Sequence, residues 1–166
     1  MIEETKAWIE VELERLASAR LELIRGDEEG GHAPPKDSRI RQVETRIRRL
    51  GLVVAALPNV DDGMLHRDRA GLGSEVIVSE GENGEEITYV LLAGPSIDVD
   101  AGEVSLGSPI GQSLLGAVPD DEVSVQTPRR IRKLVVRKVV TLAQMLDAPE
   151  IEPERASAMS SLVSAG

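Results

Sequence analysis

Three consecutive acidic residues form the most suggestive chemical group in the chain. Asp27, Glu28 and Glu29 stand in a stretch rich in glycine and proline, residues 26–38, between two segments with a helical apolar pattern. Carboxylate oxygens are ligands that Mg²⁺ prefers, and bound Mg²⁺ is often shared with a substrate phosphate. Consecutive acids on a glycine-rich loop are not preorganised, so they can only complete the metal site of another protein. The alternative is a solvated loop whose acids simply suit an exposed surface.

Two clusters of basic residues allow two interpretations each. The arginines of the segment 36–57 either neutralise the acidic segment before the loop or bind an acidic groove of a partner or phosphates. They are Arg39, Arg41, Arg46, Arg48 and Arg49. The cations of the last predicted strand either protect a sheet edge against aggregation or bind an acidic surface, and we favour the first interpretation. They are Arg129, Arg130, Arg132, Lys133, Arg137 and Lys138.

The composition excludes several classes of function. Lys and Arg total 19 against 29 Asp and Glu, so the net charge of −10 argues against direct, sequence-specific binding of nucleic acid. The only aromatic residues are Trp8 and Tyr89, the only histidines are His32 and His66, and cysteine is absent. Stacking platforms, thiol chemistry and multi-histidine metal sites are therefore excluded. We expect a cytoplasmic monomer without membrane contact, and with no catalytic residue, metal or cofactor of its own.

The first 57 residues predict an antiparallel two-helix coiled-coil hairpin whose tip is residues 26–38. Apolar residues recur every seven positions before the tip and in steps of three and four after it, as in a coiled-coil seam. Arms of about 22 residues project on the order of 30 Å, at about 1.5 Å per residue. So narrow a hairpin buries little surface, so its base must dock on the second domain or on a partner. The seam residues are Ile9, Leu13, Leu16, Leu23, Ile40, Val43, Ile47 and Leu50.

The rest of the chain predicts a β-rich domain, which makes the fold class α+β. We interpret residues 58–72 as a linker with at most a short turn, residues 73–146 as a sheet domain, and residues 147–166 as a flexible tail. Alternating and β-branched runs separated by turn residues predict five strands, with one short helix between the third and the fourth. The strands are 74–79, 86–93, 103–108, 122–126 and 130–140, and the helix is 108–116.

The sheet domain resembles a known family. Residues 103–128, EVSLGSPIGQSLLGAVPDDEVSVQTP, closely resemble the C-terminal signature of the GreA/GreB transcript-cleavage factors, with its Ser-Pro, apolar pair with Gly, acidic turn, Val-x-Val and Thr-Pro. The resemblance runs through residues 71–140, and AWIEVELERL, residues 7–16, is similar to the family's first helix. It implies an FKBP-like C-terminal domain that docks at the rim of the RNA polymerase secondary channel. It also implies a coiled coil that enters this channel toward the active centre.

The resemblance further implies which residues meet the polymerase. The expected docking residues belong to the Ser-Pro block: Ser108, Pro109, Ile110, Leu114, Leu115, Gly116, Asp120 and Asp121. In cleavage-active members, two tip acids help to bind the second catalytic Mg²⁺ of the polymerase, so the polymerase cuts backtracked RNA. The only cofactor to consider is therefore Mg²⁺ shared with the polymerase active site.

The tip departs from the family's pattern. Only Gly26-Asp27 matches in place, Gly30 follows three positions beyond Asp27, and the hairpin is shorter than the family's usual arm by a few turns. The resemblance therefore implies a transcription factor that modulates elongation without strong cleavage activity, as in the nucleoside diphosphate kinase regulator subgroup. The first alternative is a true cleavage stimulator that uses Asp27, Glu28 or Glu29. The second alternative, a prolyl isomerase-like or general interaction domain, is disfavoured because Tyr89 is the domain's only aromatic residue.

Overall fold

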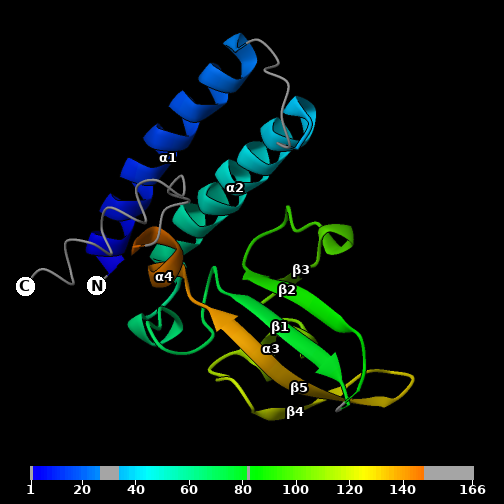
Figure 1. Ribbon diagram of the computed structural model, residues 1–166. Coiled ribbons are helices and arrows are strands. Elements are labelled where there is room, and N and C mark those ends of the chain that lie inside the picture. The colour runs from blue at the N-terminus through cyan, green and yellow to red at the C-terminus, as the bar shows by residue number, and fades with distance from the viewer. Residues whose placement is uncertain (1, 27–33, 82, 148–166) are drawn as a thin grey trace, which may run out of the picture.

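The computed structural model describes residues 2–26, 34–81 and 83–147 and consists of a helical hairpin joined to a five-stranded sheet (Figure 1). The predicted α+β fold is confirmed: the N-terminal helices precede a mixed sheet that carries one short helix between its third and fourth strands. The helices are α1 (Ile2–Arg25), α2 (Lys36–Ala56), α3 (Pro109–Leu114) and α4 (Leu142–Asp147). The strands are β1 (Glu75–Glu80), β2 (Glu86–Leu92), β3 (Glu103–Ser105), β4 (Glu122–Gln126) and β5 (Ile131–Val140).

The helices α1 and α2 lie side by side, and their open end points away from the sheet (Figure 1). Ile9, Leu16 and Leu50 of the predicted seam are buried in a core at the base of the hairpin. The seam residues Leu13, Val43 and Ile47 are partly buried against the same core, and Leu23 and Ile40, nearer the open end, are partly buried outside it. The fully buried seam residues thus lie in the core at the base of the hairpin, which docks on the sheet domain, one of the two possibilities that the sequence left open.

Ion pairs connect the two helices across the seam. The Glu12 carboxylate is buried, lies 3.1 Å from Arg46 Nη2 on α2, and accepts two hydrogen bonds from Arg15 at 2.7 and 2.8 Å. Nearer the tip, Arg20 Nε donates to Glu44 Oε1 at 2.8 Å, with both side chains exposed. The opposite net charges of the two segments thus produce direct pairs, although an exposed pair contributes only about 0–1 kcal/mol.

The sheet carries an apolar core on each face. Its strand order is β3-β2-β1-β5-β4, with β2 and β3 parallel and the other pairs antiparallel. Successive side chains of a strand point to opposite faces, so Leu91 of β2 packs in the core beneath α3 while Val90 and Leu92 pack against the base of the hairpin. Both cores therefore share β2, which couples the position of the hairpin to the sheet domain.

The segment 58–72 is more ordered than the linker that we expected. It overlaps one 3₁₀ helix, η1 (Leu57–Asn59), and contains a second, η2 (Asp62–Met64). Ala70 is buried, accepts a hydrogen bond from Gly116 N at 2.7 Å and donates one to Ala117 O at 2.9 Å. Leu65 and Leu72 are buried in the core at the base of the hairpin. The segment is therefore part of the folded body, because its apolar side chains close both cores.

The helix α4 was not expected within the predicted sheet domain. Thr141 and Gln144 form a reciprocal capping box: Thr141 Oγ1 accepts from Gln144 N at 3.2 Å, and Gln144 Oε1 accepts from Thr141 N at 2.9 Å. Leu142 is buried between the hairpin base and the sheet, where Figure 1 shows α4. The predicted tail, 147–166, lies outside the described residues except for the last residue of α4. Among the residues that the structure describes, no helix combines the length and apolarity needed to cross a membrane.

Candidate functional site

The open end of the hairpin is the first part of the candidate site. The helix α1 has 24 residues, so it spans about 36 Å at about 1.5 Å per residue. Lys36 Nζ, at the start of α2, donates to Gly26 O at 2.6 Å and to Ile24 O at 3.2 Å. This cation ties the two arms together and occupies carbonyls left open at the end of α1.

The predicted tip acids, Asp27, Glu28 and Glu29, lie outside the described residues, as does His32. What the structure describes is the pair of helix ends that carry this loop. Within residues 2–26, 34–81 and 83–147, no group of three or more acidic or histidine side chains is placed to hold a metal ion. The sharing of polymerase Mg²⁺ by the tip therefore stays a prediction.

The hairpin is fixed to the sheet by a buried carboxylate that the sequence analysis did not identify. The Glu103 side chain, at the start of β3, is fully buried. Its Oε1 accepts from Arg48 Nη1 at 2.9 Å and from Asp98 N at 3.0 Å, and its Oε2 accepts from Arg48 Nη2 and, at 2.8 Å, from Arg49 Nε. We call this group, Glu103 with Arg48 and Arg49, the arginine–glutamate junction.

The electrostatics of the junction favour the ionised carboxylate. Burial alone would raise the pKa of Glu103, but the hydrogen bonds from Arg48, Arg49 and the Asp98 backbone outweigh it and lower the pKa to about 2. The pKa of Arg48 is raised, chiefly by its hydrogen bond to Glu103. The junction is therefore a permanent ion pair at neutral pH.

The arginine–glutamate junction accounts for two of the arginines on α2, whose partners the sequence left open between the first helix and an acidic groove or phosphates. Arg46 contacts Glu12 of α1 and donates to Met145 O at 3.2 Å, so one arginine does neutralise the first helix. Arg48 and Arg49 instead bind the sheet domain, also donating to Ser96 O and to Ala101 O, each at 3.3 Å. Neither of the two interpretations had included this intramolecular partner.

The Ser-Pro block, the second part of the candidate site, is built around a close approach of α3 to β3. Ser108 caps α3: its Oγ accepts from Gly111 N at 3.1 Å and donates to Ser105 O at 2.7 Å. A Cβ on Gly111 would lie 1.9 Å from Ser105 O, so only glycine fits at this position. Gly116 ends the helical segment with φ +81°. The spacing of Ser, Pro and Gly in the block is therefore dictated by packing.

The predicted docking residues separate into surface and core positions. Pro109 and Asp120 are exposed, whereas Leu114 is fully buried under the sheet and has a packing role. The acidic turn is also structural: Asp120 has φ +73°, and Asp121 Oδ2 accepts from Val118 N at 3.0 Å. The half-buried members of the set are Ser108, Ile110, Leu115, Gly116 and Asp121. Docking through the accessible members stays a prediction.

The basic cluster near the C-terminus lies on an interior strand. β5 pairs with β1 on one side and with β4 on the other, so its cations do not protect a sheet edge as we had favoured. Arg130 and Arg132 pair with Glu80 at 3.1 and 3.4 Å, while Lys133 and Lys138 are exposed. The strand order thus removes the edge interpretation, and the binding of an acidic surface stays a prediction.

The sequence of this chain is similar to those of known proteins. The family model described as "Transcription elongation factor, GreA/GreB, C-term" matches residues 65–141. The GreA transcription elongation factor of Desulfovibrio desulfuricans is 36% identical over 130 residues, covering 73% of this chain and 80% of that protein. GreA of Geobacillus kaustophilus is 33% identical over 139 residues, covering 77% of this chain and 87% of that protein.

A solved structure completes the comparison. The crystal structure of GreA factor homolog 1 from Thermus thermophilus aligns with 84% of this chain and covers 92% of its own chain, with 20% identity and a TM-score of 0.40. The alignments with the two sequence relatives span more than two thirds of this chain and at least 80% of each relative. This chain therefore belongs to the GreA/GreB family of transcription elongation factors.

Proposed function

We propose that this transcription elongation factor binds RNA polymerase at the rim of its secondary channel and modulates elongation without strongly stimulating RNA cleavage. The observation that carries the proposal is the hairpin itself. Its base is held by an apolar core and the arginine–glutamate junction, while its open end stands away from the sheet (Figure 1). Such a narrow rod on a compact body can enter a channel that excludes the rest of the chain.

The sheet domain supplies the surface that would remain at the rim. The exposed part of the Ser-Pro block, with Pro109 and Asp120, offers contacts to a protein partner. The tip sequence supports the second half of the proposal, because only Gly26-Asp27 matches the family's pattern, Gly30 follows three positions beyond Asp27, and the arm is short. The factor has no catalytic residues of its own in this proposal and acts through the polymerase.

The test uses the full chain with core RNA polymerase. We expect the two proteins to co-purify, and we expect the factor to change the yield or pausing of transcripts without producing shortened RNA in a backtracked complex. Failure to associate with the core enzyme would overturn the whole proposal. Mg²⁺-dependent RNA shortening that Asp27→Asn abolishes and Asp61→Asn leaves intact would overturn the non-cleaving half and establish a cleavage stimulator. Asp61 is a matched control because it is an exposed acid far along the chain from the tip.

A further inference from the structure

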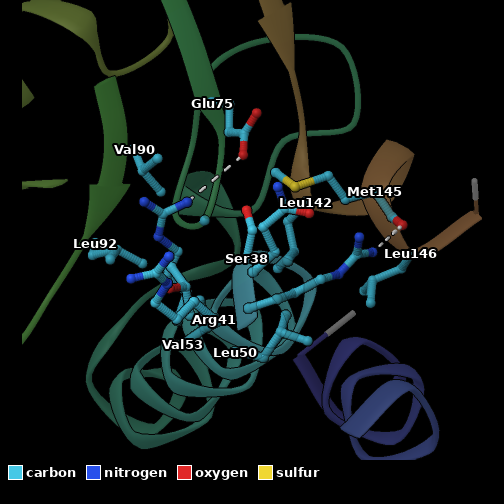
Figure 2. Close-up of a pocket in the computed structure, with 15 residues that line it drawn as sticks. Ser38, Arg41, Leu50, Val53, Glu75, Val90, Leu92, Leu142, Met145 and Leu146 are labelled. Carbon is cyan, nitrogen blue, oxygen red and sulfur yellow. Dashed lines mark hydrogen bonds and ion pairs between the residues drawn. The ribbon is translucent and has the colours of Figure 1, made fainter. Parts of the chain in front are cut away.

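A groove between α2, the sheet and α4 has the composition of a ligand site. Its volume is about 410 Å³, which falls in the range of roughly 300–1,000 Å³ typical of small-molecule pockets. The floor consists of buried apolar side chains, among them Leu50, Val53, Leu92 and Leu142. Figure 2 shows these residues converging from the helix, the sheet and α4. The groove is separate from both the hairpin tip and the Ser-Pro block.

One wall of the groove is a row of polar side chains on α2. Ser38, Arg41, Gln42 and Thr45 line it at spacings of three and four residues, which places them on one face of the helix. All four carry hydrogen-bond donors. The row therefore forms a polar wall beside an apolar floor, the arrangement that recognises an apolar body with one polar head.

The charges of the wall favour an anionic head. Three arginines, Arg41, Arg46 and Arg49, line the groove against a single acid, Glu75. Arg46 is engaged by Glu12 and Arg49 by Glu103, whereas Arg41 is exposed and has no ion pair or hydrogen-bond partner among the described residues. Arg41 is thus the cation available to a ligand, and a charged hydrogen bond to it is stronger than one between neutral groups.

We propose that the groove binds a medium-chain carboxylic acid, with the hydrocarbon chain on the apolar floor and the carboxylate at Arg41. The proposal does not depend on the proposed function, because neither the tip nor the Ser-Pro block takes part. Transfer of the hydrocarbon chain from water to the apolar floor stabilises the complex. The carboxylate can accept two hydrogen bonds from the guanidinium of Arg41. A volume of about 410 Å³ matches a small molecule rather than the broad surface of a stable protein interface.

The protein carries its own reporter for this binding. Leu142 and Leu146 of α4 line the groove on one side and, on the other, a small hollow beside Trp8, the chain's single tryptophan. A ligand in the groove therefore contacts the same helix as the indole. Titration of the full chain with octanoate, followed by Trp8 fluorescence and by calorimetry, tests the proposal directly.

We expect octanoate to bind saturably with one-to-one stoichiometry and to raise the melting temperature. Arg41→Gln should weaken octanoate about tenfold but leave the binding of octan-1-ol unchanged, because the alcohol lacks the charge. Arg129→Gln, which removes another exposed arginine outside the groove, should change neither affinity. Met145→Trp, which fills the groove from the half-buried face of α4 and is followed by calorimetry alone because it adds a second tryptophan, should abolish the binding of both ligands.

Four results would overturn the proposal. Three of them are octanoate binding that does not saturate, an Arg41→Gln affinity equal to that of Arg129→Gln, and octanol binding as tight as octanoate in the unmodified chain. A fourth is octanoate binding that is lost as protein concentration rises and a dimer forms in light scattering, which would assign the groove to a second copy of the chain.

Discussion

Replacing Glu103 by glutamine should loosen the hairpin from the sheet and remove one component of acid sensitivity. The carboxylate is fully buried and accepts hydrogen bonds from Arg48, Arg49 and the Asp98 backbone. Glu103→Gln keeps the shape of the side chain but leaves the two guanidinium groups without a counter-charge. Because one oxygen becomes an amide donor, at least one of these hydrogen bonds must also be lost.

The magnitude follows from the pKa of Glu103. Its folded value of about 2 against an ordinary value of 4.5 corresponds to about 3 kcal/mol, at about 1.4 kcal/mol per pKa unit. The Arg48 and Arg49 side chains are 38% and 23% exposed, so water screens part of this interaction, and we expect a loss of about 2 kcal/mol at neutral pH. Urea unfolding of both proteins at pH 7 measures the difference.

The pH dependence has a definite sign. The pKa of Glu103 is lower in the folded chain than in the unfolded chain, so the unfolded chain binds more protons between about pH 2 and pH 4.5. The free energy of unfolding therefore rises with pH in this range. The contribution of Glu103 is complete above about pH 4.5 and is lost as the pH falls toward about 2. Glu103→Gln should therefore show a shallower loss of stability on acidification than the unmodified chain.

Glu122→Gln, at an exposed position of β4, is the matched control and should leave both the urea midpoint and the acid slope unchanged. The reasoning is refuted if Glu103→Gln unfolds at the same urea concentration as this control. It is equally refuted if the acid slope of the Glu103→Gln protein matches that of the unmodified chain.

Three further predictions concern packing and capping. Gly111→Ala should destabilise the protein by about 2 kcal/mol or more in urea unfolding, because its Cβ would clash with Ser105 O, whereas Gly107→Ala, whose Cβ meets only Ser105 Oγ at 3.7 Å, should be near neutral. Thr141→Val should cost about 1 kcal/mol in the same assay, since it removes the hydroxyl that caps α4. Leu16→Ala should cost about 2–5 kcal/mol, whereas the exposed Val11→Ala should stay within about 0.5 kcal/mol, and equal effects would contradict the seam assignment.

The helices and strands could be predicted where the spacing of apolar residues, or the residues at a helix end, indicates which side chains are buried. The heptad spacing of Ile9, Leu16 and their counterparts on α2 predicts the hairpin, because a regular apolar stripe must face another surface. The Ser108-Pro109 start and Gly116 end define the segment of the short helix α3 for similarly local reasons. The six-residue helix α4 is too short for periodicity, and its only signal was the capping box of Thr141 and Gln144.

The relations between distant segments were not predictable from local patterns. Glu103 begins a short strand, where an acid is normally exposed, and its partner Arg48 lies 55 positions earlier. Nothing in the local sequence of either residue indicates the other. The position of β5 between β1 and β4 is similarly set by tertiary pairing, so the cations of β5 suggested an edge that does not exist.

The arginine–glutamate junction explains how the small sheet domain can fix the orientation of the helical hairpin. The apolar core at the hairpin base holds α2 to the sheet, but hydrophobic contact is not directional and would allow the helix to rotate or slide. Two consecutive arginines point about 100° apart around a helix, so only one orientation of α2 lets both Arg48 and Arg49 reach the same carboxylate. Breaking a buried pair leaves an uncompensated charge, which makes every other orientation costly. We infer that the apolar core supplies the affinity between hairpin and sheet, while the arginine–glutamate junction sets the direction in which the tip points.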